Sequence, residues 1–113
     1  YYLAMNYEKQ GKYTEADNFY VSYMNKNPDD PNIYNQYGAF LINMKNYETA
    51  LSYIEKGLKK ADKDSERALL YNEAICYEYM GNYDKALELF ESYVGKYPED
   101  KAAKKEYNFL KTR

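Results

Sequence analysis

A repeated segment with a period of about 34 residues most constrains how this chain can fold. GKYTEA at 11–16 recurs as KNYETA at 45–50 and as GNYDKA at 81–86, so that its final alanine returns after 34 and then 36 residues. A repeat of this length is one supersecondary unit that cannot bury its apolar face alone, whereas stacked units bury a continuous core. The sequence therefore predicts a stack of similar units.

A proline marks the end of the first and third copies. Pro28 and Pro98 each follow the final alanine of their copy by twelve residues, and Asp62 stands at the corresponding place in the middle copy. The middle spacing is also two residues longer, and we place the extra residues in a loop at 62–64. The period therefore continues through the middle copy without its proline.

Each copy is predicted to form two helices, because apolar residues recur at helical spacing before and after the turn. Residues with helix-capping side chains support the expected helix starts: Asp30 before Pro31, Asn46, Asn82, and Asp64 or Ser65. We expect helices near 1–10, 14–26, 31–44, 47–61, 65–80, 83–96 and 99–111.

This pattern resembles the tetratricopeptide repeat family over nearly the whole chain. The matching positions of the first helices are small, then large and apolar: Ala4, Gly38 and Ala74, then Tyr7, Leu41 and Tyr77. Those of the second helices follow the same rule: Ala16, Ala50 and Ala86, then Tyr20, Ile54 and Phe90. Pro28 and Pro98 match the closing proline of the motif. The resemblance implies an all-α fold, an α-solenoid of three antiparallel helix-pair repeats plus a C-terminal capping helix.

We expect a single domain over 1–113, with repeats at about 1–30, 31–66 and 67–98. The terminal helix, at 99–113, is expected to cover the open edge of the last repeat, as stacked arrays require. Because the chain opens at Tyr1, inside an expected helix and without a methionine, we expect it to be a piece of a longer protein.

Two residues depart from the family pattern. Gly57 stands where alanine is usual, and Glu73 stands where the family places a buried leucine. A buried carboxylate without a partner is costly, and burial raises its pKa. We therefore expect Glu73 to lie at a margin of the core or to pair with a neighbour.

Composition excludes several classes of function. The net charge of −2 argues against a nucleic-acid partner, and no apolar run is long enough for membrane insertion. With no histidine and a single cysteine, Cys76, His-based acid–base pairs, Cys–His nucleophiles, zinc sites and intramolecular disulfides cannot be built. Acidic residues in 62–73 have the spacing of a calcium loop, but Arg67 occupies the position that needs glycine. We expect no enzyme activity, no metal and no cofactor.

The resemblance implies that the first helices line a concave groove, which is where a partner would bind. By register, the groove residues are Tyr1, Tyr2, Met5, Asn32, Asn35, Gln36, Ala39, Asn43, Tyr71, Asn72, Ile75, Tyr79, Lys104 and Tyr107. Asn and Gln can pair with both groups of a peptide unit, and Tyr offers a rigid surface with a polar tip. We expect Asn35, Gln36 and Asn72 to fix a partner's backbone, and Tyr71 and Tyr79 to pack its side chains.

Other tyrosines occupy packing positions of the motif and are expected in the core: Tyr7, Tyr13, Tyr20, Tyr34, Tyr37, Tyr47, Tyr77 and Tyr83. Cys76 is expected there too, as a small apolar residue.

The sequence therefore predicts a non-catalytic interaction scaffold that binds a peptide segment or helix of a partner protein. The alternative is a structural module that forms homo-oligomers through its exposed repeat edges. Family members that clamp the free carboxylate of chaperone tails carry Lys and Arg in the groove, where this chain has Tyr1, Met5, Gln36, Ala68 and Asn72. A co-chaperone role is therefore not expected. Frequent Lys, Asn and Tyr fit a bacterium with an AT-rich genome, in its cytoplasm or cell envelope.

Overall fold

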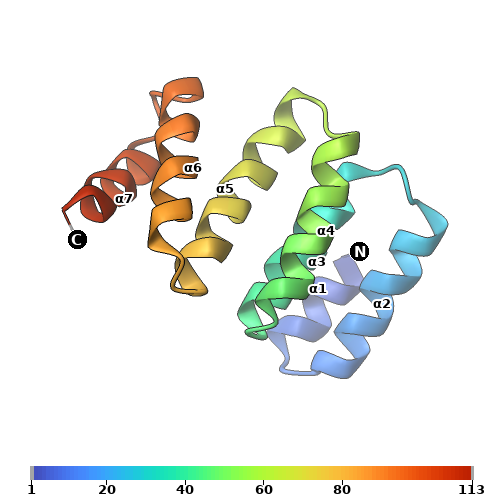
Figure 1. The fold of residues 1–113 in the computed structure, drawn as a ribbon. Coiled ribbons are helices and arrows are strands. Elements are labelled where there is room, and N and C mark those ends of the chain that lie inside the picture. The colour runs from blue at the N-terminus through green and yellow to red at the C-terminus, as the bar shows by residue number, and fades with distance from the viewer. Residues whose placement is uncertain (1, 113) are drawn as a thin grey trace.

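The computed structural model describes residues 2–112, which form seven α-helices joined by short turns (Figure 1). They are α1 (Tyr2–Lys9), α2 (Tyr13–Lys26), α3 (Pro31–Asn43), α4 (Tyr47–Lys60), α5 (Lys63–Tyr79), α6 (Tyr83–Lys96) and α7 (Lys101–Lys111). Successive helices pack as antiparallel neighbours, and α7 lies at the end of the stack remote from α1 and α2. The predicted all-α solenoid of helix pairs is confirmed.

The turn inside each pair needs a residue with a left-handed backbone. Gly11 and Gly81 supply it with φ of 77° and 82°, which glycine adopts at no steric cost. Lys45 takes the same role in the middle copy with φ of 63°. The middle turn therefore keeps the shape of the other two although its residue is strained there.

The predicted start of the fifth helix is wrong, and so is the predicted loop at 62–64. The connection between α4 and α5 is only Ala61 and Asp62, and the helix begins at Lys63. Asp62 caps it: its carboxylate accepts from the Ser65 N–H at 2.9 Å, and the Ser65 hydroxyl accepts from the Asp62 N–H at 3.0 Å. This reciprocal capping box stabilises an earlier start than Asp64 or Ser65 would give. The two extra residues of the middle copy therefore lengthen α5.

The other caps follow the sequence with two differences. Asp30 and Asn82 accept from backbone N–H groups of α3 and α6, as predicted, whereas the Asn46 side chain makes no capping hydrogen bond. The last helix begins at Lys101 rather than at 99, because the Asp100 carboxylate accepts from the Ala103 N–H at 3.1 Å.

Apolar side chains form two clusters along the stack. The first joins α1 to α4 with part of α5, around Tyr20, Ile33 and Ile54, and the second joins α5, α6 and α7 around Phe90 and Leu110. All five of these side chains are buried. Because α5 contributes to both clusters, it is the helix that makes the stack one body.

Most of the tyrosines expected in the core do pack there. Tyr20, Tyr34 and Tyr37 are buried, and the rings of Tyr7, Tyr47 and Tyr77 are half-buried against the clusters. The prediction was wrong for Tyr13 and Tyr83, which are 47% and 40% exposed. Each is the first residue of its second helix, at the end of a hairpin; Tyr47 holds the same position in the middle copy but is covered by Tyr79, whose ring stacks on it at 6.1 Å.

Glu73 lies at a margin, half-buried on α5, as predicted. Burial raises the pKa of its carboxyl, the nearby Glu55 raises it further, and Lys85 acts in the opposite direction. The ionised form is therefore disfavoured in the folded chain.

Replacing Glu73 with glutamine is expected to raise the free energy of unfolding at pH 7 by about 0.5 kcal/mol. The folded-state pKa is raised, so the cost of the charge is present at neutral pH and is relieved as pH falls through that pKa. Urea denaturation of both proteins at pH 7 and pH 5 measures the difference. A difference in the free energy of unfolding that is larger at pH 5 than at pH 7 would contradict the raised pKa of Glu73.

Candidate peptide-binding groove

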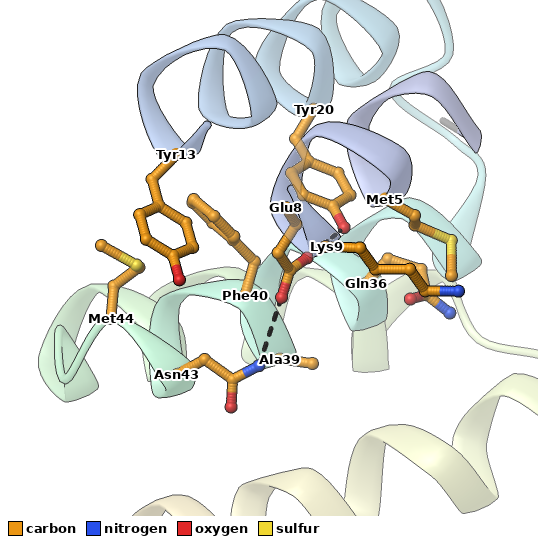
Figure 2. A pocket seen from close by; sticks show the side chains of 10 residues that line it. All are labelled: Met5, Glu8, Lys9, Tyr13, Tyr20, Gln36, Ala39, Phe40, Asn43 and Met44. Carbon is orange, nitrogen blue, oxygen red and sulfur yellow. Dashed lines mark hydrogen bonds between the residues drawn. The ribbon is translucent and has the colours of Figure 1, made fainter. Parts of the chain in front are cut away.

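Two hollows open between successive first helices of the repeats. The α1/α3 hollow, of about 470 Å³, lies between those two helices, and Tyr13 and Tyr20 of α2 also line it (Figure 2). The α5/α7 hollow, of about 420 Å³, lies between α5 and the start of α7 and includes Tyr93 of α6. They repeat one arrangement at the two ends of the stack, because each is enclosed by two first helices and the second helix between them in sequence.

The α1/α3 hollow combines apolar walls with one fixed carboxylate. Met5, Phe40 and Tyr13 are among its lining residues, and Glu8 points into it (Figure 2). One oxygen of Glu8 accepts from the Tyr20 hydroxyl at 2.8 Å, and the other accepts from the Asn43 amide at 3.2 Å. Both donors are neutral, so they orient the carboxylate and leave its charge in place.

The α5/α7 hollow is built around Arg67, near the start of α5. Its guanidinium lies 3.2 Å from Glu99 and 3.5 Å from Asp100, and its Nε donates to the Tyr93 hydroxyl at 3.3 Å. The same guanidinium stacks on Tyr97, 5.1 Å from the ring centre. Arg67 is therefore already engaged by two carboxylates and two aromatic residues.

Asp100 ties the start of α7 to α5 and α6. Its carboxylate accepts from the Tyr93 hydroxyl at 2.8 Å, and this bond, the Ala103 N–H and Arg67 together lower the pKa of Asp100. Burial and the same carboxylate raise the pKa of Tyr93 to about 12. At neutral pH the pair is an ionised aspartate and a neutral tyrosine, which is the arrangement that keeps this hydrogen bond.

Replacing Asp100 with alanine is expected to cost about 1–2 kcal/mol of stability at pH 7, because α7 loses its cap and Tyr93 loses its acceptor. The lowered folded-state pKa means that this contribution is complete above the unfolded pKa of about 4 and is lost as pH falls through the folded value. Chemical denaturation at pH 7 and pH 3 checks it. An equal loss at both values would show that the charge is not involved.

At the side of the α5/α7 hollow that faces α3, the amides of Asn35 and Asn72 join α3 to α5. The Asn72 amide nitrogen donates to the Asn35 carbonyl oxygen at 2.6 Å. Both residues are half-buried, and within residues 2–112 neither side chain makes another hydrogen bond. Within residues 2–112, the Asn35 amide nitrogen and the Asn72 carbonyl oxygen are therefore without a hydrogen-bond partner.

The predicted groove residues do not all gather in one place. Met5, Gln36, Ala39 and Asn43 line the α1/α3 hollow. Tyr71 and Asn72 line the α5/α7 hollow, where the Tyr71 ring packs edge-on against Phe90 and Tyr93 at 5.8 and 5.6 Å. The first-helix face therefore carries two hollows, and Asn72, which lines the second, is hydrogen-bonded to Asn35 of α3.

Other predicted groove residues lie outside these hollows. Tyr2 faces a separate hollow against α2, and Tyr79, which is 62% exposed, stacks on Tyr47 with ring centres 6.1 Å apart. Asn32 and Lys104 are exposed.

Two more of the predicted residues pack toward the end of the stack, and one is not described. Ile75 packs against the second core cluster, and the half-buried Tyr107 lies under the Lys111 ammonium, 4.5 Å from the ring centre. Tyr1 lies outside the described residues.

Sequence reasoning missed Glu8, Arg67 and Asp100. A signal for the last was present, because Tyr23 and Asp30 have the same seven-residue spacing as Tyr93 and Asp100. The Tyr23 hydroxyl donates to Asp30 at 2.9 Å, so the first repeat makes the same tyrosine–aspartate hydrogen bond as the third. In both repeats a tyrosine lies seven residues before an N-cap aspartate and donates to it.

The cysteine of this chain is a core residue. Cys76 is buried, its thiol donates to the Tyr47 carbonyl at 3.3 Å, and burial raises the pKa of that thiol to about 11. Residues 2–112 contain no cluster of metal-ligating side chains. No helix in that part of the chain is long and apolar enough to span a membrane.

Comparison with known proteins places this geometry in a family. A tetratricopeptide repeat family model matches residues 29–99, and a second one matches residues 1–30. Anaphase-promoting complex subunit 6 of Arabidopsis thaliana is 29% identical over 93 residues, which are 80% of this chain and 17% of the plant protein. This chain therefore spans a small part of that relative.

A solved structure has the same fold. It is the first TPR domain of Spaghetti (RPAP3) bound to the HSP90 peptide SRMEEVD, and the two structures superpose with a TM-score of 0.83. The match covers 96% of this chain and 87% of that one at 19% identity. Since the family model over 29–99 alone covers more than half of the residues, this chain belongs to the tetratricopeptide repeat family, whose domains typically serve protein interaction.

Proposed function

We propose that this chain is a non-catalytic interaction module that binds a peptide segment or helix of a partner protein on the face of α1, α3, α5 and α7. The observation that carries the proposal is the pair of hollows together with the Asn35–Asn72 amide pair. Concave sites lined by apolar walls and a few oriented polar groups are where ligands bind most often.

The two hollows lie at opposite ends of their helices. The α1/α3 hollow includes Glu8 and Asn43, the last turns of α1 and α3, whereas the α5/α7 hollow includes Arg67 and Asp100, at the starts of α5 and α7. A bound segment would therefore cross the face diagonally. One of its side chains would enter each hollow, while its backbone would pass the free amide and carbonyl groups of Asn35 and Asn72.

Selection from a random peptide library displayed on phage tests this function. Peptides that bind the chain should lose binding to an Ala39→Arg variant, because a long side chain there would fill the α1/α3 hollow. A Ser52→Arg variant, with the same added charge at an exposed position of α4, should bind as the wild type does. Equal binding by both variants, once circular dichroism shows them folded, would end the proposal.

Self-association is the second candidate function, and an exposed apolar edge supports it. Tyr2, Leu3 and Phe19 are 77%, 59% and 39% exposed on α1 and α2, where a neighbouring helix would bury them. Adjacent exposed apolar side chains are typical of interaction surfaces. Sedimentation velocity of this chain from micromolar to millimolar concentration decides it: dimers at the upper end would support the second function, and a monomer throughout would exclude it.

A further inference from the structure

We infer that the side chain entering the α1/α3 hollow is a lysine or arginine of the partner, so that this face selects a basic segment. The inference rests on the proposed function and names the chemistry of the partner. It is argued from the charges and contacts of the two hollows.

The Glu8 carboxylate is held ready for a cation. Its two oxygens accept from Tyr20 and Asn43, which come from α2 and α3, so the carboxylate is fixed by helices other than its own. Among the described residues it forms no ion pair. Lys9 follows it in sequence and lines the same hollow, but Figure 2 shows the Lys9 ammonium pointing away from the carboxylate.

The walls of the hollow suit the stem of a long basic side chain. Met5 and Phe40 provide apolar surface on either side of Glu8, and Tyr13 adds an exposed ring at the far end (Figure 2). Lysine and arginine bury their methylene groups along such surface while the charged head reaches a polar partner. An aromatic ring near the head adds a cation–π contact.

The charges of the α5/α7 hollow favour the same partner. Arg67 is the cationic residue that lines this hollow, and it already forms ion pairs with Glu99 and Asp100. Asp64 also lines this hollow and forms no ion pair among the described residues. Among the described residues, each hollow therefore presents a carboxylate outside any ion pair, which favours a cationic side chain over an acidic one there.

Two synthetic peptides test the inference on the chain as it is. They are acetyl-Ala-Ala-Arg-Ala-Ala-amide and the same peptide with glutamate in place of arginine, each titrated into the labelled protein and followed by amide chemical shifts. The arginine peptide should shift the amides of Met5, Ala39 and Asn43, and the glutamate peptide should not. Equal shifts with both peptides would overturn the inference.

A matched pair of variants isolates the carboxylate. Glu8→Gln keeps an acceptor for Tyr20 and removes the charge, and it should weaken arginine-peptide binding about tenfold, as expected for a hydrogen bond to a charged group. Glu91→Gln makes the same charge change at an exposed position of α6 and should leave binding unchanged. Equal weakening by the two variants, or none by Glu8→Gln, would show that the cation does not bind at Glu8.

The outcome is separable from that of the proposed function. If library peptides lose binding with Ala39→Arg but carry no excess of Lys or Arg and ignore Glu8→Gln, the groove function stands and the basic partner is wrong. If no library peptide depends on the groove, both fail.

Discussion

Replacing Phe90 with alanine is expected to lower the free energy of unfolding by about 3–5 kcal/mol, the usual cost of removing a buried aromatic ring. Phe90 is fully buried at the centre of the second core cluster, where Tyr71 packs edge-on against it at 5.8 Å. The cavity would lie between α5, α6 and α7, which share this cluster. Urea denaturation measures the loss.

Hydrogen exchange would identify which helices of the Phe90→Ala variant lose stability. Repeat arrays are stabilised by contacts between neighbours, so a defect spreads weakly along the stack. We expect faster exchange in α6 and α7 of the Phe90→Ala variant, with α1 to α3 close to the wild type. An Ile54→Ala variant, with its cavity in the first cluster, should show the reverse order. Uniform acceleration in both variants would mean that the stack unfolds as one unit.

Replacing Gly57 with valine is expected to cost about 2–3 kcal/mol through overpacking. A Cβ added at Gly57 would lie 2.8 Å from the Tyr34 Cβ and 3.0 Å from a methyl group of Leu69. The Tyr34 Cβ is fixed to the backbone of α3, and Leu69 is fully buried, so neither can move aside cheaply. The gain in helix propensity over glycine is smaller than this clash.

Gly95→Val is the matched control in α6, because nothing lies within 4 Å of the Cβ position there. Its stability should stay within about 0.5 kcal/mol of the wild type. Thermal unfolding of the two variants beside the wild type tests the pair. Similar melting temperatures for both variants would mean that α4 shifts outward freely and that close approach at Gly57 is unimportant.

The sequence predicts the helices of this chain well because its signals are local and repeated. Apolar spacing and the alanine of each second helix specify the pairs, and Asp30 with Pro31 marks the start of α3. The predicted start of α5 was wrong because Asp62, Asp64 and Ser65 can all cap a helix and lie within four positions of one another. Only the reciprocal bonds of the folded chain decide among them.

The candidate site was less predictable because it depends on how far apart first helices lie. Register places Gln36 and Asn43 on the face of α3 that lines the hollow, but it cannot show that α1 and α3 enclose a hollow with Glu8 inside it. It also cannot show that Asn35 and Asn72 bond to each other. Spacings between helices arise from many side chains at once, whereas a sequence motif reports one position at a time.

The tyrosine–aspartate hydrogen bonds affect whether one copy of the repeat could replace another. Tyr23 with Asp30 and Tyr93 with Asp100 fasten the first and third copies, whereas the middle copy has Gly57 at the tyrosine position. Exchanging the middle copy for either neighbour would place a tyrosine ring in the space that Tyr34 and Leu69 fill. The three copies are alike in sequence, yet they are not interchangeable, because the middle copy needs glycine where its neighbours carry tyrosine.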